Sequence, residues 1–168
     1  MTVFLIGFMG SGKTTFGKKL ATKLKLEFVD LDEQICISNK TESINSLIEL
    51  KGFDYFRKTE SETLKSISIG NSLVSTGGGT PCYFNNIDWM KQNGTVVFIQ
   101  VDEGVLLSRL KNTDLDQRPL LKGLDEEGLK TFISEKLKER LPFYEQAHFV
   151  FNPVNEKIEV LVEKIQKL

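Results

Sequence analysis

The residues best suited to chemistry lie near the start of the chain, in the segment 7–14, Gly-Phe-Met-Gly-Ser-Gly-Lys-Thr. This segment fits the pattern G-x-x-x-x-G-K-[ST], a loop whose backbone N–H groups surround phosphate oxygens. In such a loop Lys13 brings a positive charge to the β- and γ-phosphates, and the hydroxyl of Thr14 binds Mg²⁺. The apolar run 3–6 before it and the four-residue spacing of apolar residues after it predict a flanking strand and helix. We therefore expect a nucleoside triphosphate site rather than a simple glycine turn.

A pair of carboxylates, Asp30 and Asp32, follows the second strand-like run, 27–30. On an extended backbone the two side chains project to the same side, with Cα atoms about 6.6 Å apart. They repel each other unless a cation lies beside them, and Mg²⁺ and Lys13 are the candidates. The alternative is that they cap the next helix and occupy its first turn, a role that aspartate fills well. Both interpretations can hold together.

Three consecutive glycines, Gly77, Gly78 and Gly79, follow the strand-like run 73–76. Glycines in this position indicate either that another group closely approaches the backbone or that the backbone angles would exclude a side chain. Open α/β sheets bind their ligands at the carboxyl ends of their strands. The position after a strand therefore favours a ligand site.

Two arginines are candidates for the same site. Arg57 lies on the predicted helix 53–64, three residues before Glu60, so that an i,i+3 ion pair can orient it. Arg118 lies in 111–123, a polar stretch long enough to form a lid, and an arginine on a lid can stabilise a transferring phosphoryl group. The alternative for each is a solvated surface arginine.

Composition narrows the class of protein. The 168 residues are 40% hydrophobic and 27% charged with a net charge of −1, which is typical of a globular protein, and we expect one domain over 1–168. This charge gives no reason to expect nucleic acid or an anionic membrane as a partner. The apolar runs are too short to cross a bilayer, and the strand after Met1 leaves no room for a signal peptide, so we expect a cytoplasmic protein.

The cysteines and the histidine do not indicate another chemistry. Cys36 and Cys82 lack the spacing of a metal cluster and do not suggest a disulfide framework, so we expect buried or half-buried apolar contacts from both. The single histidine, His148, begins an apolar run, and we interpret it as structural. No G-x-S-x-G motif accompanies it, which argues against a Ser-His-Asp triad.

The chain alternates between strand and helix patterns, which predicts an α/β fold with helices on both faces of a parallel sheet. Strands are expected at 3–6, 27–30, 73–76, 95–101 and 149–151. Right-handed crossovers then bring the loop, the aspartates and the glycines to one crevice. Helices are expected directly after the loop, directly after Asp102 as a cap, and at 44–48, 53–64, 87–94 and 158–165. Gly52 is expected to end the helix that begins at 44. A long helix is expected from Asp125 to about Tyr144, with Pro142 kinking or ending it.

Together these motifs resemble the shikimate kinases, in order and over nearly the whole chain. The resemblance implies a P-loop kinase fold, which is a three-layer sandwich around a five-stranded parallel sheet, and a monomer. It implies ATP-dependent phosphorylation of the 3-hydroxyl of shikimate with Mg²⁺, a step toward chorismate and the aromatic amino acids. The residues that carry it are Gly-Phe-Met-Gly-Ser-Gly-Lys-Thr-Thr (7–15), Asp30-x-Asp32, Phe56-Arg57, Gly77-Gly78-Gly79, Arg118-Pro119-Leu120-Leu121 and Arg140-x-Pro142-x-Tyr144.

The resemblance also implies roles for the matching residues. Asp30 corresponds to the magnesium-side aspartate, and Thr14 to the direct metal ligand. Asp32 corresponds to the residue that contacts the ring hydroxyls and helps to deprotonate the attacking one. Arg57 and Arg140 correspond to the pair that grips the carboxylate of shikimate. The chemistry agrees, because a small carboxylic acid is held in orientation by planar two-pronged donors.

The other implied contacts involve both substrates. Shikimate is expected to bind within about 32–60 and along the glycines, with the N–H of Gly78 facing it. The lid, about 111–123, is expected to exclude water, and the segment 152–156 has the position of the adenine loop. The implied ATP-binding residues are Gly10, Ser11, Gly12, Lys13, Thr14, Thr15, Arg109 beside the adenine and Arg118 over the phosphates.

Some positions depart from the family pattern. Phe53 lies where a glutamate is usual, an acidic residue is replaced near Cys36, and a usual glycine is Lys40 or Thr41. These positions put the affinity for shikimate in doubt more than the reaction.

Three alternatives remain to be weighed. A gluconate or nucleoside-monophosphate kinase of the same fold would not need Arg57 and Arg140 together with three glycines. A GTP-binding switch would need a guanine-reading element such as N-K-x-D, which the sequence lacks. A binding module without activity is disfavoured by the intact set of Lys13, Thr14, Asp30, Asp32 and Arg118.

Overall fold

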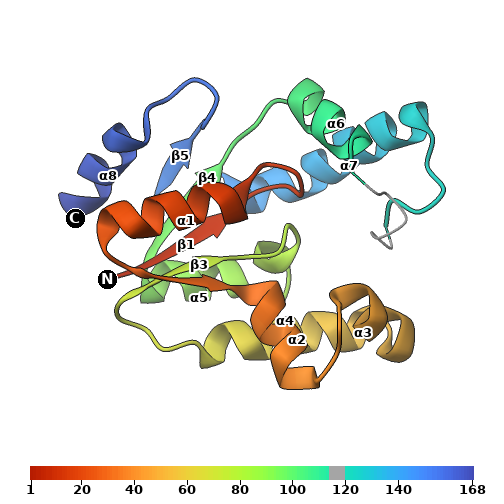
Figure 1. The fold of residues 1–168 in the computed structure, drawn as a ribbon, viewed down its shortest axis with the longest axis horizontal. Coiled ribbons are helices and arrows are strands. Elements are labelled where there is room, and N and C mark those ends of the chain that lie inside the picture. The colour runs from red at the N-terminus through yellow and green to blue at the C-terminus, as the bar shows by residue number, and fades with distance from the viewer. Residues whose placement is uncertain (114–119) are drawn as a thin grey trace.

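The strand-like runs form one parallel sheet in the computed structural model, which describes residues 1–113 and 120–168. The strand order across the sheet is β2-β3-β1-β4-β5, and Figure 1 shows helices on both sides of it. The predicted α/β fold with a five-stranded parallel sheet is therefore confirmed. The strands are β1 (Thr2–Ile6), β2 (Glu27–Asp30), β3 (Ser72–Ser75), β4 (Thr95–Ile99) and β5 (Phe149–Phe151).

The central strand is β1, and every one of its residues is buried. Val3 and Leu5 pack into one apolar cluster, whereas Phe4 and Ile6 pack into another on the opposite face. A continuous apolar run of this kind is typical of a strand covered on both faces. Leu5 pairs with Ser75 of β3, so the segments that follow β1 and β3 leave the sheet side by side. This register places the phosphate-binding loop next to the three glycines.

The helices cover the two faces of the sheet and connect its strands. The helical elements are α1 (Lys13–Leu24), α2 (Leu31–Asn39), α3 (Ile44–Lys51), α4 (Phe53–Ser66), the short 3₁₀ helix η1 (Thr80–Cys82), α5 (Asn86–Asn93), α6 (Glu103–Lys111), α7 (Glu126–Tyr144) and α8 (Ile158–Gln166). The cluster around Val3 and Leu5 contains residues of α1, α6 and α8, and the cluster around Phe4 and Ile6 contains residues of α2, α3, α4 and α5. Because α7 contributes to both clusters, it ties the two layers together.

Several predicted ends differ from the structure. β4 ends at Ile99 rather than at Val101. Asp102 precedes α6 as expected, but its side chain makes no capping hydrogen bond. By contrast, α7 runs through Pro142 to Tyr144, which confirms the expected end at about Tyr144. A proline in the last helical turn removes only one backbone N–H bond, so the turn that carries Tyr144 persists.

His148 has the structural role that its position predicts. Its Nδ1 accepts a hydrogen bond from the N–H of Val96 (2.9 Å), and its own N–H donates to the carbonyl oxygen of Val96 (2.9 Å). The residue therefore extends the pairing of β4 with β5. Within the described part of the chain, the helices are all too short or too polar to span a membrane.

Candidate active site

The phosphate-binding loop, 7–14, has the backbone that its motif predicts. It follows β1 and leads into α1, with Gly12 as the N-cap. Gly7, Gly10 and Gly12 have φ values of +145°, +78° and +89°, a region that glycine adopts without strain. No side chain caps the first turn of α1, so its N–H groups and the positive end of its dipole remain for an anion. The loop is therefore built to bind phosphate.

Lys13 lies across this loop. Its Nζ donates hydrogen bonds to the carbonyl oxygens of Gly7 (2.8 Å) and Phe8 (2.9 Å). The Oγ of Ser11 is buried, and no described residue supplies a hydrogen-bond partner for it. A phosphate in the loop would offer both groups a charged acceptor, which makes a stronger hydrogen bond than a neutral carbonyl.

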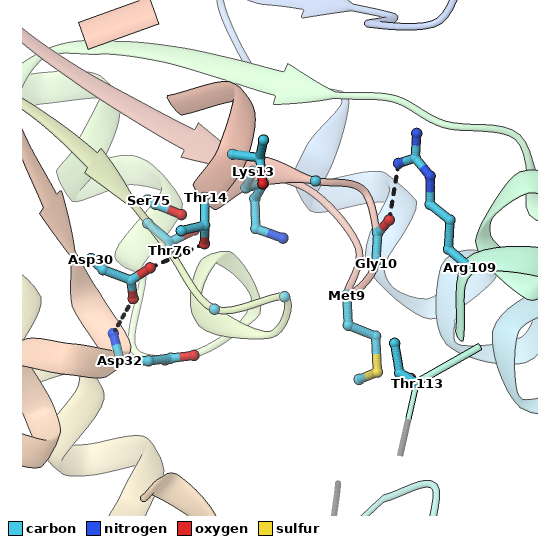
Figure 2. Close-up of a pocket in the computed structure, with 14 residues that line it drawn as sticks. Met9, Gly10, Lys13, Thr14, Asp30, Asp32, Ser75, Thr76, Arg109 and Thr113 are labelled. Atoms are coloured by element: carbon cyan, nitrogen blue, oxygen red, sulfur yellow. Dashed lines mark hydrogen bonds between the residues drawn. The ribbon is translucent and has the colours of Figure 1, made fainter. Parts of the chain in front are cut away.

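Asp30 links the metal-binding candidates to the start of α2. Its carboxylate accepts one hydrogen bond from the hydroxyl of Thr14 (3.1 Å) and another from the N–H of Asp32 (3.1 Å), as Figure 2 shows. β2 ends at Asp30 and Asp32 lies in the first turn of α2, so the prediction of an extended backbone through both residues is wrong. The helix-capping interpretation holds, and both carboxylates still line one cavity. The adjacent oxygens of Thr14 and Asp30 are the ligand type that Mg²⁺ prefers.

The carboxylate of Asp32 is perturbed by its surroundings. Desolvation, followed by the negative charges of Glu60 and Asp30, raises the pKa of Asp32 to about 6, while Lys13 and Arg57 act in the opposite direction. Although protein atoms surround this carboxylate, the residue is exposed to the open cleft, so water still reaches it. An aspartate with a raised pKa is a stronger base than an ordinary one and is still ionised at neutral pH.

The three glycines form a turn, 77–79, that lets charged groups approach the backbone. A Cβ at Gly77 would lie 2.8 Å from Oε1 of Glu60, and one at Gly78 would lie 3.1 Å from Nη1 of Arg140. A Cβ at Gly79 would lie 2.5 Å from Nη2 of Arg57. The three residues have ordinary φ values. Of the two interpretations offered by the sequence, close approach is therefore the correct one.

Arg57 is held at this glycine turn by its own helix. Its Nη1 donates to Oε2 of Glu60 at 2.7 Å, which confirms the predicted i,i+3 ion pair, and the side chain of Glu60 is fully buried. The guanidinium lies over the rings of Phe56 (4.9 Å) and Tyr83 (4.6 Å). A stacked and paired guanidinium has little freedom to turn. Arg57 is therefore oriented rather than solvated.

Arg140, on α7, approaches the turn from the other side. The residue is only 7% exposed, its guanidinium lies 5.3 Å from the ring centre of Phe8, and its Nη1 is buried with no hydrogen-bond partner in the described part of the chain. One turn further along, the hydroxyl of Tyr144 donates to the carbonyl oxygen of Gly78 (2.5 Å). A buried charged N–H group without a hydrogen-bond acceptor is costly, so this nitrogen favours an anionic ligand.

Two cavities are lined by residues that pack against the glycine turn. The first, of about 400 Å³, is lined by the phosphate-binding loop, Asp30, Asp32 and the first two glycines, and so confirms that these three motifs share one crevice. The second, of about 360 Å³, is lined by Arg57, Arg140 and Cys82 among others. Burial raises the pKa of Cys82 to about 11, so the thiol stays neutral beside the two arginines. Asp32 and the two arginines therefore all pack against the glycine turn, as the predicted site requires, although they line two cavities rather than a single one.

Arg109 binds the phosphate-binding loop from α6. Nη1 of Arg109 donates to the carbonyl oxygens of Gly10 and Ser11, both at 3.1 Å, and in Figure 2 it lies across the loop from the two aspartates. Arg109 and Pro153 line a further cavity of about 420 Å³. The predicted lid residue Arg118 lies outside the described residues.

Comparison with known proteins shows the family to which the chain belongs. The family model for shikimate kinase matches residues 9–168. A shikimate kinase of Bacteroides fragilis is 39% identical over 99% of this chain and 94% of its own, and one of Bacillus cereus is 33% identical over 99% and 96%. The chain belongs to the shikimate kinase family. The solved shikimate kinase from Bacteroides thetaiotaomicron has a TM-score of 0.87 at 37% identity over 99% of this chain and 97% of its own, and one from Acinetobacter baumannii in complex with shikimate has 0.85 at 32% over 99% and 90%.

The departures from the shikimate kinase pattern lie at the start of α4, within α2 and at the end of α2. Phe53 is 39% exposed and lines the second cavity beside Arg57. Cys36 is half-buried in α2. Lys40 caps the end of α2 with φ +52°, which explains why glycine is usual near this position. The expected half-burial of both cysteines is confirmed.

The sequence did not reveal the residues that pack against the arginines and the glycine turn of the shikimate kinase site. Phe8 lies under Arg140 although it occupies a variable position of the loop motif, and Tyr83 lies under Arg57. Thr80 and Asn86 are fully buried polar residues near the glycine turn. A polar residue directly after three glycines was the available signal for Thr80, but spacing alone does not reveal its partner.

Proposed function

We propose that this chain transfers the γ-phosphoryl group of ATP to the 3-hydroxyl of shikimate, giving shikimate 3-phosphate and ADP. The observation that supports it is the glycine turn, 77–79, against which Asp32, Arg57 and Arg140 all pack while Gly78 also faces the phosphate-binding loop. A base, a carboxylate-binding pair and a phosphate site are thereby adjacent. A hydroxy acid is the class of acceptor that needs all three.

The acceptor is held through its carboxylate. Arg57 and Arg140 reach the glycine turn from different helices, α4 and α7, and two planar guanidinium groups fix both the position and the tilt of a carboxylate. The buried Nη1 of Arg140 would gain the partner that the described residues do not provide. The backbones of Gly77, Gly78 and Gly79 form the adjoining wall.

Asp32 is the proposed general base. Its carboxylate lines the first cavity beside the phosphate-binding loop, and its raised pKa lets it take the proton of the attacking hydroxyl. Lys13 stabilises the negative charge on the transferring group, because phosphoryl transfer depends on positioning and charge stabilisation more than on covalent chemistry. Arg118 remains a predicted partner of the ATP phosphates.

ATP is proposed to occupy the loop and the cavity beside Arg109. Thr14 and Asp30 would hold Mg²⁺, which supplies positive charge between the phosphate groups when it is bound. The fit is supported by the contact between the Thr14 hydroxyl and the Asp30 carboxylate (3.1 Å). The proposed phosphate contacts are Gly10, Ser11, Gly12, Lys13, Thr14 and Thr15.

A coupled assay of ADP release tests the proposal. Purified protein with ATP and Mg²⁺ is offered shikimate, gluconate or a nucleoside monophosphate, and the variant Lys13→Met serves as the inactive control. We expect ADP release that depends on shikimate and not on the other acceptors. Release with gluconate or a nucleotide in place of shikimate would contradict the proposal.

A further inference from the structure

Glu60 has a second partner besides Arg57. The hydroxyl of Thr80 donates to its Oε1 at 2.6 Å, while its Oε2 accepts from Arg57 at 2.7 Å. Glu60 and Thr80 are both fully buried. A Cβ at Gly77 would lie 2.8 Å from Oε1 of Glu60 and 3.1 Å from Oγ1 of Thr80. The absence of a side chain at Gly77 therefore leaves room for the hydrogen bond between Thr80 and Glu60.

Thr80 is itself fixed to the helix that carries Arg57. Its carbonyl oxygen accepts from Nδ2 of Asn86 (2.9 Å), and Oδ1 of Asn86 accepts from the hydroxyl of Ser61 (2.7 Å). Ser61 follows Glu60 in α4, so the hydrogen bonds form a closed circuit between α4, η1 and the start of α5. Because the circuit is buried and satisfied, it holds the hydroxyl of Thr80 in one place.

The position of this hydroxyl determines how Glu60 can bind Arg57. A carboxylate and a guanidinium tend to pair through two parallel hydrogen bonds when both oxygens are available. Thr80 donates to Oε1 and thereby sets the rotation of the Glu60 carboxylate, which holds Arg57 through Oε2. The other amino nitrogen of Arg57, Nη2, lies against the glycine turn, and the side chain borders the second cavity. Loss of the hydroxyl would let the carboxylate rotate until both of its oxygens bind the guanidinium, which would draw Arg57 away from a ligand.

We propose that Thr80 is a positioning residue for the acceptor substrate, since its hydroxyl restrains Glu60 and thereby presents Arg57 to the substrate carboxylate. This inference rests on the proposed function. It assigns Thr80 no contact with substrate. Its effect is on the binding of shikimate rather than on the chemical step or on ATP.

Steady-state kinetics of Thr80→Val and Thr80→Ser test the inference. Valine keeps the shape and removes the donor, so we expect the KM for shikimate to rise about tenfold, with the KM for ATP and kcat within about threefold of the wild-type values. Serine keeps the donor and should restore the KM for shikimate to within about twofold of wild type. Thr63→Val makes the same change on α4, at a half-buried residue outside the circuit, and is the matched control.

Repeating the Thr80→Val substitution in the Arg57→Ala variant shows whether Thr80 acts through Arg57. In Arg57→Ala the guanidinium is absent, so adding Thr80→Val should change the KM for shikimate by less than about twofold. If thermal unfolding shows that Thr80→Val does not fold, the smaller Thr80→Ala replaces it with the same expectations. Equal KM values for the valine and serine variants, or a full further loss in the Arg57→Ala background, would overturn the role of Thr80. A wild-type enzyme that does not use shikimate would instead overturn the proposed function.

Discussion

The phosphate-binding loop, 7–14, and the glycine turn, 77–79, lie side by side at the ends of β1 and β3, and each contains three glycines. In the loop the glycines have positive φ values, from +78° to +145°. In the turn the φ values are ordinary, and a Cβ would instead meet Glu60, Arg140 or Arg57. Glycine is therefore needed for backbone conformation in one region and for space in the other.

This difference reflects how each region binds its ligand. The loop offers backbone N–H groups and a helix N-terminus, all from one short stretch of chain. The turn is a surface on which side chains from α2, α4 and α7 converge. Their charges influence one another, since Glu60 pairs with Arg57 and both act on the pKa of Asp32. We therefore expect glycine substitutions in the loop to affect ATP binding, substitutions in the turn to affect shikimate binding, and substitution of Asp32 to affect the chemical step.

The largest effect is expected at Asp32, where the two regions meet. Asp32→Asn removes the proposed base with little change of shape, so kcat should fall by about 10²–10⁴ while ATP binding stays intact. Turnover assays and calorimetric titration with ATP measure the two quantities. A loss of ATP affinity would place Asp32 with the phosphate-binding loop instead.

Arg140 should give the next largest effect and mark the turn as the acceptor side. Arg140→Ala removes a desolvated carboxylate contact, so the KM for shikimate should rise roughly thirtyfold or more while the KM for ATP changes little. Arg109→Ala is the matched variant. Because Arg109 borders the cavity proposed for the nucleotide, we expect its KM for ATP to rise while its KM for shikimate changes little. An unchanged KM for shikimate in Arg140→Ala would break the comparison.

Substitutions of the glycines test the difference between the loop and the turn, with smaller expected effects. Gly12→Ala forces alanine to φ +89°, and Gly79→Ala puts a Cβ 2.5 Å from Arg57. We expect a rise of about tenfold in the KM for ATP in the first variant and for shikimate in the second. If both variants raised both KM values equally, the two regions would not be separable.

The pH profile of kcat/KM for shikimate should report the raised pKa of Asp32. The base acts only when ionised, so activity is present above pH about 6 and falls as the pH drops through that value. Below it the decline should approach about tenfold per pH unit, and the residual activity of Asp32→Asn should lack this limb. An acid limb near pH 4 would mean that the cleft does not perturb Asp32.

The smallest effect concerns stability alone and lies outside both regions. Lys40 ends α2 at φ +52°, so Lys40→Gly should raise the free energy of unfolding by roughly 0.5–1 kcal/mol in denaturant titrations. Lys58→Gly, inside α4, is the opposite control and should lower it by about 1 kcal/mol. A destabilised Lys40→Gly would show that positive φ is not what makes glycine usual there.

The sequence predicted the loop better than the turn for a physical reason. The loop motif is contiguous, so its glycines, Lys13 and flanking elements could be inferred from spacing. The alternating pattern also predicted the parallel sheet, and with it the meeting of Asp30, Asp32 and the glycine turn. Gly52 ends α3 as expected because a glycine at positive φ is a local signal.

What could not be predicted depends on contacts between distant segments. The sequence left the backbone at Asp32 open between an extended segment and a helix start, because a capping aspartate and a strand-end aspartate look alike in sequence. The stacking of Arg140 on Phe8 and the bond from Thr80 to Glu60 join residues that no spacing rule connects. The role of Arg140 came from the family resemblance, because a single arginine near the end of a helix carries no signal of burial.

The position of the transferred phosphate tests the central claim most directly. Phosphorus–proton correlation NMR of the product formed from ATP and shikimate identifies the esterified oxygen. If the carboxylate is held at Arg57 and Arg140 while Asp32 faces the loop, the phosphorus should couple to the proton on carbon 3 alone. Coupling to another ring proton, or inorganic phosphate as the only product, would contradict the arrangement.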